Sequence, residues 1–123
     1  MKKVVTLLNC IDGLFQDAGL NYVRNLHEGF IVDNITFPGM DNVFIEGNDD
    51  AKSTLEYSID ISISRGSKVI YLAGHSNCTG NVKCDGNHLI EVEKSVQYLK
   101  DIYPNLSIKG IFIEIDYNVK EIG

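Results

Sequence analysis

Short apolar runs alternate with longer amphipathic segments along the chain. Four runs are rich in β-branched residues and bounded by polar, glycine or proline positions, which is typical of strands buried in a sheet. They cover residues 3–10, 30–37, 67–74 and 106–115. The first strand is expected to end near Asn9, and the second is stopped by Pro38 and Gly39.

The three segments between these runs repeat apolar positions at helical spacing, and each ends at a glycine or just before a proline. We therefore predict helices over residues 19–29, 48–66 and 87–103. The middle segment is ambiguous because residues 59–64 also alternate apolar and polar positions, as a strand would. Its length, a cap at Asn48 or Asp49 and the stop at Gly66 favour the helix.

Strands that alternate with helices predict an α/β fold with helices on both faces of a parallel sheet. We expect one domain over residues 1–123, a three-layer αβα arrangement with a mostly parallel four-stranded sheet of order 2-1-3-4. In that order the winding reverses between the first and third strands, and ligands bind beyond the carboxyl ends of the strands there. The loops after these two strands should therefore face each other.

Composition narrows the function. The 123 residues carry a formal charge of −6 and only two arginines, Arg24 and Arg65, which argues against a nucleic-acid partner. No apolar run approaches the roughly 20 residues of a membrane span. The apolar run at residues 4–8 is too short for a signal peptide, so we expect a cytoplasmic protein. The three cysteines indicate thiols rather than a disulfide framework.

The two facing loops, residues 9–13 and 74–80, would bring Cys10, Asp12, His75 and Cys78 to one crevice. Two thiolates and an imidazole form a ligand set of catalytic zinc, which leaves a fourth position for water or a carboxylate. An ordinary metal-free loop remains the alternative. A phosphatase-like nucleophile is disfavoured because the arginine that would clamp the oxyanion is replaced by Gln16.

The stretches "CIDG" and "GHSNCTGN" resemble the β-class carbonic anhydrases, whose pattern is C-x-D-x-R followed by H-x-x-C. The match is closer to a compact branch that also has a Pro-Gly loop, here Pro38-Gly39, and a downstream histidine, here His88. The resemblance implies that Cys10, His75 and Cys78 bind Zn²⁺, with the Asp12 carboxylate beside the metal. It also implies hydration of carbon dioxide to bicarbonate, and a homodimer or larger assembly, for which the apolar residues 111–113 offer a surface.

One position departs from the family pattern: Leu14 stands where the resemblance places an arginine paired with the aspartate. Without that arginine, Asp12 either binds zinc as a fourth ligand or is held off it by another donor, such as a backbone N–H or a lysine. Two functions follow as hypotheses. The first is a zinc enzyme with weak or altered activity on carbon dioxide or a related small heterocumulene, and the second is a zinc-binding or redox-sensing protein without hydration activity.

Three further residues have expected roles near this crevice. Cys84 would support the redox hypothesis by pairing with a released ligand thiol, although a small buried or loop cysteine is the plainer interpretation. His88 is expected to cap the last helix or contact a ligand residue rather than bind metal. Gly39 is expected either to let the backbone approach a substrate or merely to make a turn. Away from the crevice, on the first predicted helix, His27 is expected to be a surface or half-buried histidine.

Overall fold

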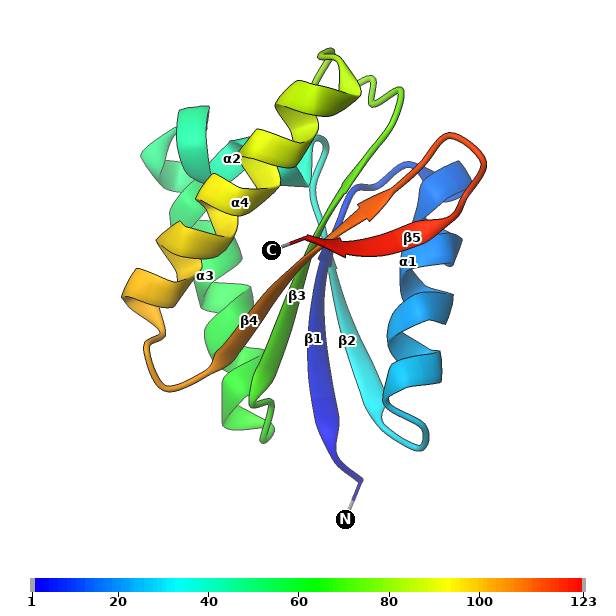
Figure 1. The fold of residues 1–123 in the computed structure, drawn as a ribbon. Coiled ribbons are helices and arrows are strands. Elements are labelled where there is room, and N and C mark those ends of the chain that lie inside the picture. Colours follow the sequence, from blue (N-terminus) through cyan, green and yellow to red (C-terminus); the bar gives the residue numbers. More distant parts are fainter. Residues whose placement is uncertain (1, 123) are drawn as a thin grey trace.

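The computed structural model describes residues 2–122 as one α/β layer structure (Figure 1). The helices and strands follow in chain order: β1 (Val4–Asn9), α1 (Gly13–Leu26), β2 (Ile31–Thr36), α2 (Met40–Glu46), α3 (Asp49–Ser64), β3 (Val69–His75), α4 (Asp85–Ile102), β4 (Ser107–Ile113) and β5 (Val119–Ile122). The strand–helix alternation predicted from the hydrophobic pattern is confirmed.

The sheet has the strand order β2-β1-β3-β4-β5. The first four strands are mutually parallel in the predicted order 2-1-3-4, and β5 adds an antiparallel edge strand paired with β4. The expected sheet was therefore one strand short. This fifth strand covers the edge that Ile111, Phe112 and Ile113 would otherwise expose, and all three are at most 2% exposed. These residues cannot form the dimer surface expected from the sequence.

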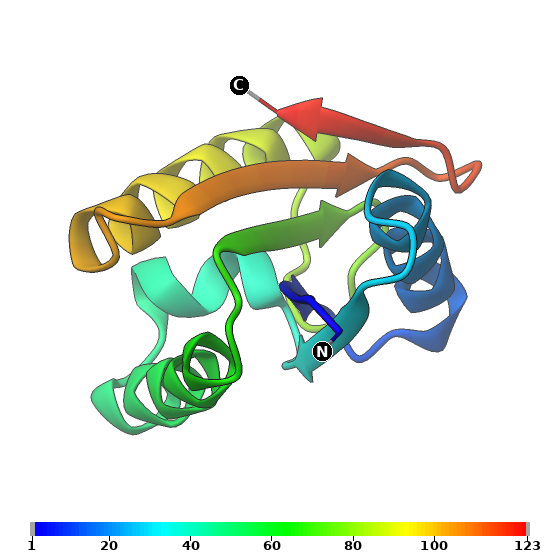
Figure 2. The same cartoon turned by 90° about the horizontal axis from the view of Figure 1, so that it is seen from below.

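Helices cover both faces of the sheet (Figure 2). On one face α1 packs over a core that includes Val5, Leu7, Val23, Tyr71 and Ile111. On the other face α2, α3 and α4 enclose a core that includes Leu8, Phe44, Ile59, Leu72 and Leu99. Neighbouring β1 residues point to different cores, Leu7 to one and Leu8 to the other, which explains why most of this strand is apolar.

The helix predicted over residues 48–66 forms as α3, and the strand alternative for residues 59–64 is wrong. Asn48 caps the helix by accepting a hydrogen bond from the Ala51 N–H at 2.8 Å, and Gly66 lies beyond its end with a φ of 106°. Ser62, polar in the alternating pattern, is buried and bonds to Thr6 at 2.6 Å, so its polarity does not indicate exposure. None of the helices within residues 2–122 is both long and apolar enough to cross a membrane.

Three local features differ from the expectations. Helix α1 begins at Gly13, six residues before the predicted start at residue 19, because Asp12 caps it. Helix α2 was not predicted; it is only seven residues long, and its apolar positions Met40, Val43 and Phe44 are the spacing that would have revealed it. Strand β5 was missed because four residues with two charges give little hydrophobic signal.

Candidate metal centre

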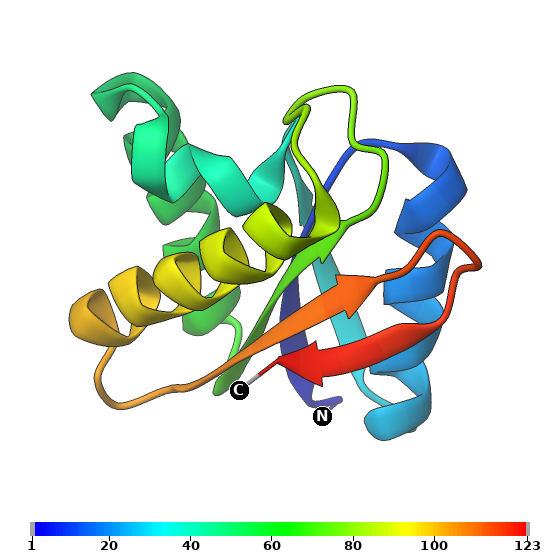
Figure 3. The same cartoon turned by 45° about the horizontal axis from the view of Figure 1, so that its top comes forward.

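The loops that follow β1 and β3 meet at the carboxyl ends of the strands, as the strand order predicted (Figure 3). One ligand atom each from Cys10, His75 and Cys78 lies within 4.8 Å of the others, and all three side chains are buried. The two Sγ atoms are 3.8 Å apart. Cys10 follows β1 directly, whereas His75 is the last residue of β3 and Cys78 lies in the loop beyond it. The sheet therefore sets the position of two of the three donors.

The His75 ring is oriented so that one nitrogen is free for a metal. Its Nδ1 donates a hydrogen bond to the Ser76 carbonyl oxygen at 2.6 Å, and its ring stacks on Phe15 of α1 with centroids 4.3 Å apart. Its Nε2 is buried and has no hydrogen-bond partner within residues 2–122. Because an orphaned buried nitrogen is costly, a lone pair facing two thiols is the arrangement of a metal ligand.

The pKa values of the two thiols are shifted in opposite directions. The hydrogen bond with Cys78 is the main reason that the pKa of Cys10 falls to about 3, against the opposing effect of burial. The same hydrogen bond, together with burial, raises the pKa of Cys78. The pKa of His75 is also raised: burial acts to lower it, but contacts with the Cys10 sulfur and the Ser76 carbonyl outweigh burial. These shifts favour the thiolate form of Cys10, which is the form in which a cysteine binds a metal ion.

Backbone groups surround both sulfurs. Cys10 is contacted by the backbone of Asp12 and Gly39, and Cys78 by the backbone of Gly80 and Asn81, and all four contacts favour the thiolate form. Polar backbone contacts of this kind compensate for burying negative charge. Two thiolates and one imidazole nitrogen fit a tetrahedral Zn²⁺ with one position left for another ligand.

Asp12 lies beside this cluster but serves as the cap of α1. Its Oδ1 accepts a hydrogen bond from the Leu14 backbone N–H at 2.9 Å. Of the two alternatives for an aspartate without its arginine, the backbone donor is present, and ligation of a metal by Asp12 stays a prediction. The Leu14 side chain is 68% exposed, so it makes no buried contact with the carboxylate.

A pocket of about 340 Å³ opens beside Cys10. Its lining combines apolar side chains with backbone: Cys10, Ile11, Asp12, Pro38, Thr79 and Gly80. A small pocket with one carboxylate suits a small, uncharged molecule better than a large or highly charged one.

Gly39 does not line this pocket; it packs behind it. It has a left-handed backbone with a φ of 65°, and a Cβ there would lie 2.7 Å from the Gly80 carbonyl oxygen. The close approach expected of this glycine is therefore to the neighbouring loop. Whether it also touches a substrate stays a prediction.

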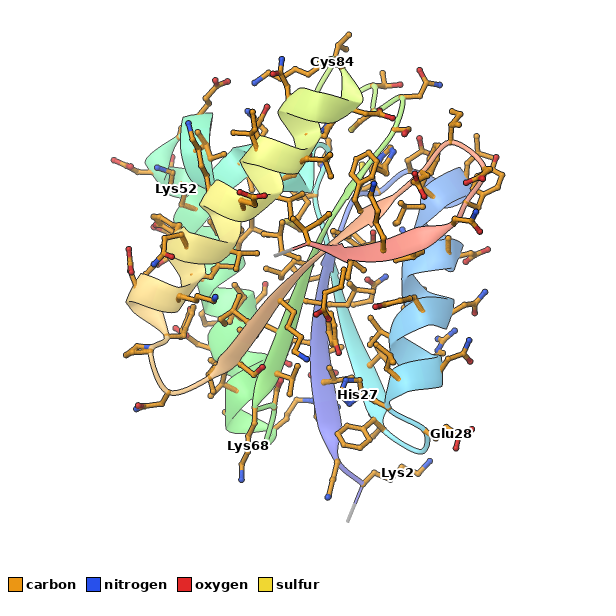
Figure 4. The ribbon with its side chains drawn as sticks, in the orientation of Figure 1. Lys2, His27, Glu28, Lys52, Lys68 and Cys84 are labelled. Carbon is orange, nitrogen blue, oxygen red and sulfur yellow. The ribbon has the colours of Figure 1, made fainter. Side chains whose placement is uncertain are left out.

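Cys84 and His88 lie outside the cluster. Cys84 is an exposed free thiol at the start of α4, near the end of the molecule opposite His27 (Figure 4). His88, fully buried in α4, forms an ion pair through Nδ1 with Asp41 Oδ2, which agrees with a supporting rather than a metal-binding histidine. Its hydrogen bond to Asp41 is the main reason that the pKa of His88 is raised.

The sequence analysis missed two buried polar residues next to the cluster: Asp41, the partner of His88, and Asn81, which contacts Cys78. Asp41 and Asn81 are at most 6% exposed and bond to each other through Oδ1 and Nδ2 at 3.0 Å. Asp41 falls in the helix that was not predicted, so its burial could not be expected. Recognising the i, i+3, i+4 spacing of Met40, Val43 and Phe44 would have placed it on a packed helix.

The fold and this cluster define a class: an α/β protein with a buried Cys-His-Cys group of metal-ligand type at the reversal point of its sheet. The sequence model of the family described as "Putative carbonic anhydrase" matches residues 1–123, the whole chain. The chain belongs to this family. None of the curated proteins is similar enough to match it.

Solved structures share the fold. The carbonic anhydrase from Glaciozyma antarctica superposes with a TM-score of 0.62 at 20% identity, over 97% of this chain and 81% of that one. A second match comes from the crystal structures of two tetrameric β-carbonic anhydrases from the filamentous ascomycete Sordaria macrospora. Its chain superposes with a TM-score of 0.58 at 16% identity, over 100% of this chain and 82% of its own length. At these identities the likeness concerns the fold.

Proposed function

We propose that the protein is a zinc-dependent carbonic anhydrase-like enzyme that hydrates carbon dioxide to bicarbonate with weak activity. The observation that carries the proposal is the convergence at one buried point of Cys10, Cys78 and His75 Nε2, which has no hydrogen-bond partner among residues 2–122. Membership of the family and the fold of its structural neighbours support the same chemistry. Cys10, His75 and Cys78 would hold the ion.

A zinc ion held there supplies a Lewis acid that lowers the pKa of water toward neutrality. The protein's own residues do the rest. The lining by Ile11, Pro38 and the Thr79-Gly80 backbone excludes bulk water from one side of the pocket and accepts a small apolar molecule. Asp12 Oδ2 is assigned as the oxygen that accepts the water's proton or hydrogen bond, since Oδ1 is held by Leu14.

The absence of an arginine partner for Asp12 is the reason for weak activity. A hydrogen bond from one backbone N–H orients the carboxylate but contributes no positive charge, whereas a guanidinium does both. With two thiolates offsetting much of the metal's charge, acidification of water depends strongly on such surrounding groups.

Zinc content and turnover test the proposal together. The purified wild type should carry about one zinc ion per chain under reducing conditions, and Cys10→Ser and Cys78→Ser should each lose most of it. Cys84→Ser is the matched control, because this thiol is exposed and outside the cluster, and it should keep its zinc. Stopped-flow hydration of carbon dioxide must exceed the buffer rate; turnover equal to buffer with zinc present overturns the enzymatic part.

A non-catalytic zinc-binding or thiol redox protein is the second candidate. It is favoured by the engagement of Asp12 as a helix cap and by the 3.8 Å separation of the Cys10 and Cys78 sulfurs. Full zinc loading without hydration would select this function. A disulfide mapped to Cys84 after mild peroxide treatment would assign it the predicted redox role.

We also propose a cytoplasmic homo-oligomer, with a dimer as the smallest unit. Structural neighbours described as tetrameric support an assembly, although the surface expected at residues 111–113 is covered by β5. Sedimentation at micromolar concentration would measure the state directly, and a monomer at all concentrations would contradict it.

A further inference from the structure

Asp41 is a buried carboxylate joined to the metal-binding loop. It is 2% exposed, and its Oδ1 accepts a hydrogen bond from the Asn81 side chain at 3.0 Å. Asn81 in turn places its backbone against the Cys78 sulfur. On its other side Asp41 is hydrogen-bonded to the fully buried His88, so the carboxylate has a polar partner within the core. A chain of contacts thus runs from α4 through α2 to one sulfur.

The start of helix α2, which carries Asp41, also lies close to the other two ligand residues. A Cβ at Gly74, the residue before His75, would lie 2.7 Å from Asp41 Oδ2, so only glycine leaves room for the carboxylate at the end of β3. Gly39, at the start of α2 and two residues before Asp41, contacts the Cys10 sulfur through its backbone. Helix α2 is therefore a common support for all three donors.

We propose that Asp41 is a positioning residue for the metal centre, acting through Asn81 to hold Cys78 at the distance from Cys10 that tight zinc binding needs. The inference rests on the proposed function, since it requires that the cluster bind zinc. It assigns a role to a residue that contacts no metal ligand through its own side chain. Buried groups that orient ligands typically change metal affinity about 10–100-fold when replaced.

The test compares zinc affinity of Asp41→Asn with that of the wild type, by competition with a chromophoric chelator in the full-length protein. Asp41→Asn keeps the side chain's size but removes its charge, and should bind zinc about 10–100-fold more weakly. Ser95→Ala is the matched control: this fully buried hydroxyl donates to the Asp41 backbone oxygen at 3.0 Å and leaves the carboxylate alone. It should lower stability while changing zinc affinity less than about twofold.

Cobalt substitution gives a readout that a merely structural role would not move. The thiolate-to-cobalt charge-transfer band should shift or weaken in Asp41→Asn and stay unchanged in Ser95→Ala. Asn81→Ala keeps the backbone contact with Cys78 but removes the carboxamide that Asp41 holds. It should reproduce the loss of affinity, and the double variant should lose no more than Asn81→Ala, since both substitutions weaken the same hydrogen bond.

Each possible result either supports or overturns the role assigned to Asp41. If Asp41→Asn does not fold, Asn81→Ala alone decides, and zinc affinity within about twofold of wild type overturns the inference. Equal losses in Asp41→Asn and Ser95→Ala, or additive losses in the double variant, also overturn it. A wild type that takes up no zinc refutes the proposed function as well, whereas wild-type zinc binding that Asp41→Asn retains refutes only the inference.

Discussion

The backbone N–H of Leu14 donates to Asp12 Oδ1 at 2.9 Å, while the Leu14 side chain points into solvent. Position 14 therefore supports the carboxylate through its main chain only. An arginine there could reach back over the helix N-terminus without displacing any buried group, since the present side chain is 68% exposed. A single substitution, Leu14→Arg, could therefore place a positive charge beside Asp12.

Leu14→Arg should raise carbon dioxide hydration by about tenfold or more, because a properly oriented and ionised proton acceptor contributes roughly 10²–10⁴-fold. Stability should change by less than about 0.5 kcal/mol, as for other exposed positions. Stopped-flow measurement on the zinc-loaded protein checks the rate. Leu14→Gln, which adds a polar but uncharged side chain, is the control and should leave the rate near wild type. No gain in a folded, zinc-loaded Leu14→Arg would count against the charge explanation.

Zinc affinity should rise with pH. In the metal-free protein the pKa of Cys78 is raised, mainly by its hydrogen bond with Cys10, so this thiol must lose a proton when the ion binds. One proton released per ion corresponds to about a tenfold gain in affinity per pH unit. The slope should steepen at lower pH, because the pKa of His75 is raised as well. Calorimetry in two buffers of different ionisation enthalpy would count the protons, and a pH-independent affinity would contradict the prediction.

A histidine far from the metal centre should make stability fall in mild acid. Burial, and secondarily Lys109, lower the pKa of His27, and its Nε2 bonds to the Tyr71 hydroxyl at 2.8 Å. Below the ordinary histidine pKa of about 6.5 the unfolded chain takes up a proton that the folded protein does not. The free energy of unfolding should therefore decrease as pH falls through the interval between that value and the lowered one.

His27→Gln isolates this effect. Denaturant unfolding of wild type and variant, at about pH 8 and about pH 5, gives the difference in their free energies of unfolding, which removes contributions common to both. At the higher pH the variant should be less stable, by about 0.5–1.5 kcal/mol for one hydrogen bond, and the gap should narrow at the lower pH. A gap that is constant or wider in acid would show that the pKa of His27 is not lowered in the folded protein.

The parallel sheet and the Cys-His-Cys cluster were predictable for the same physical reason. Strands buried on both faces are continuous apolar runs, so β1 and β3 stand out, and their order alone places the residues after them at one edge. Strand order alone was therefore enough to place Cys10 and His75 close together. Cys78 followed from its three-residue spacing to His75, because a tight loop brings both to the same point.

The parts that were missed lack a long-range hydrophobic signal. Helix α2 has only two turns and β5 only four residues, so their stability comes from packing and pairing rather than from local propensity. The burial of Asp41 followed from neither charge nor periodicity, because a carboxylate in the core needs a partner that is distant in sequence, here His88. Neither strand order nor a motif links positions 41 and 88, so this contact could not be inferred from the sequence.

The contact between two glycines of different loops gives a last prediction. Gly39 has a φ of 65°, and a Cβ on it would lie 2.7 Å from the Gly80 carbonyl oxygen. Gly39→Ala should cost about 1–2 kcal/mol for the left-handed backbone, plus a further loss because backbone cannot move aside easily. The loop displaced by that clash carries Cys78, so zinc affinity should fall too.

Gly29→Ala separates these two causes. Gly29 also has a positive φ, 82°, but a Cβ there meets no atom within 4 Å, so only the backbone cost applies. We expect Gly29→Ala to lower the free energy of unfolding by about 1–2 kcal/mol while zinc affinity stays at the wild-type value. Denaturant unfolding and chelator competition measure both quantities on each variant. If the two variants behave alike, Gly39 is a turn residue only, and the approach of the two loops does not hold the metal centre together.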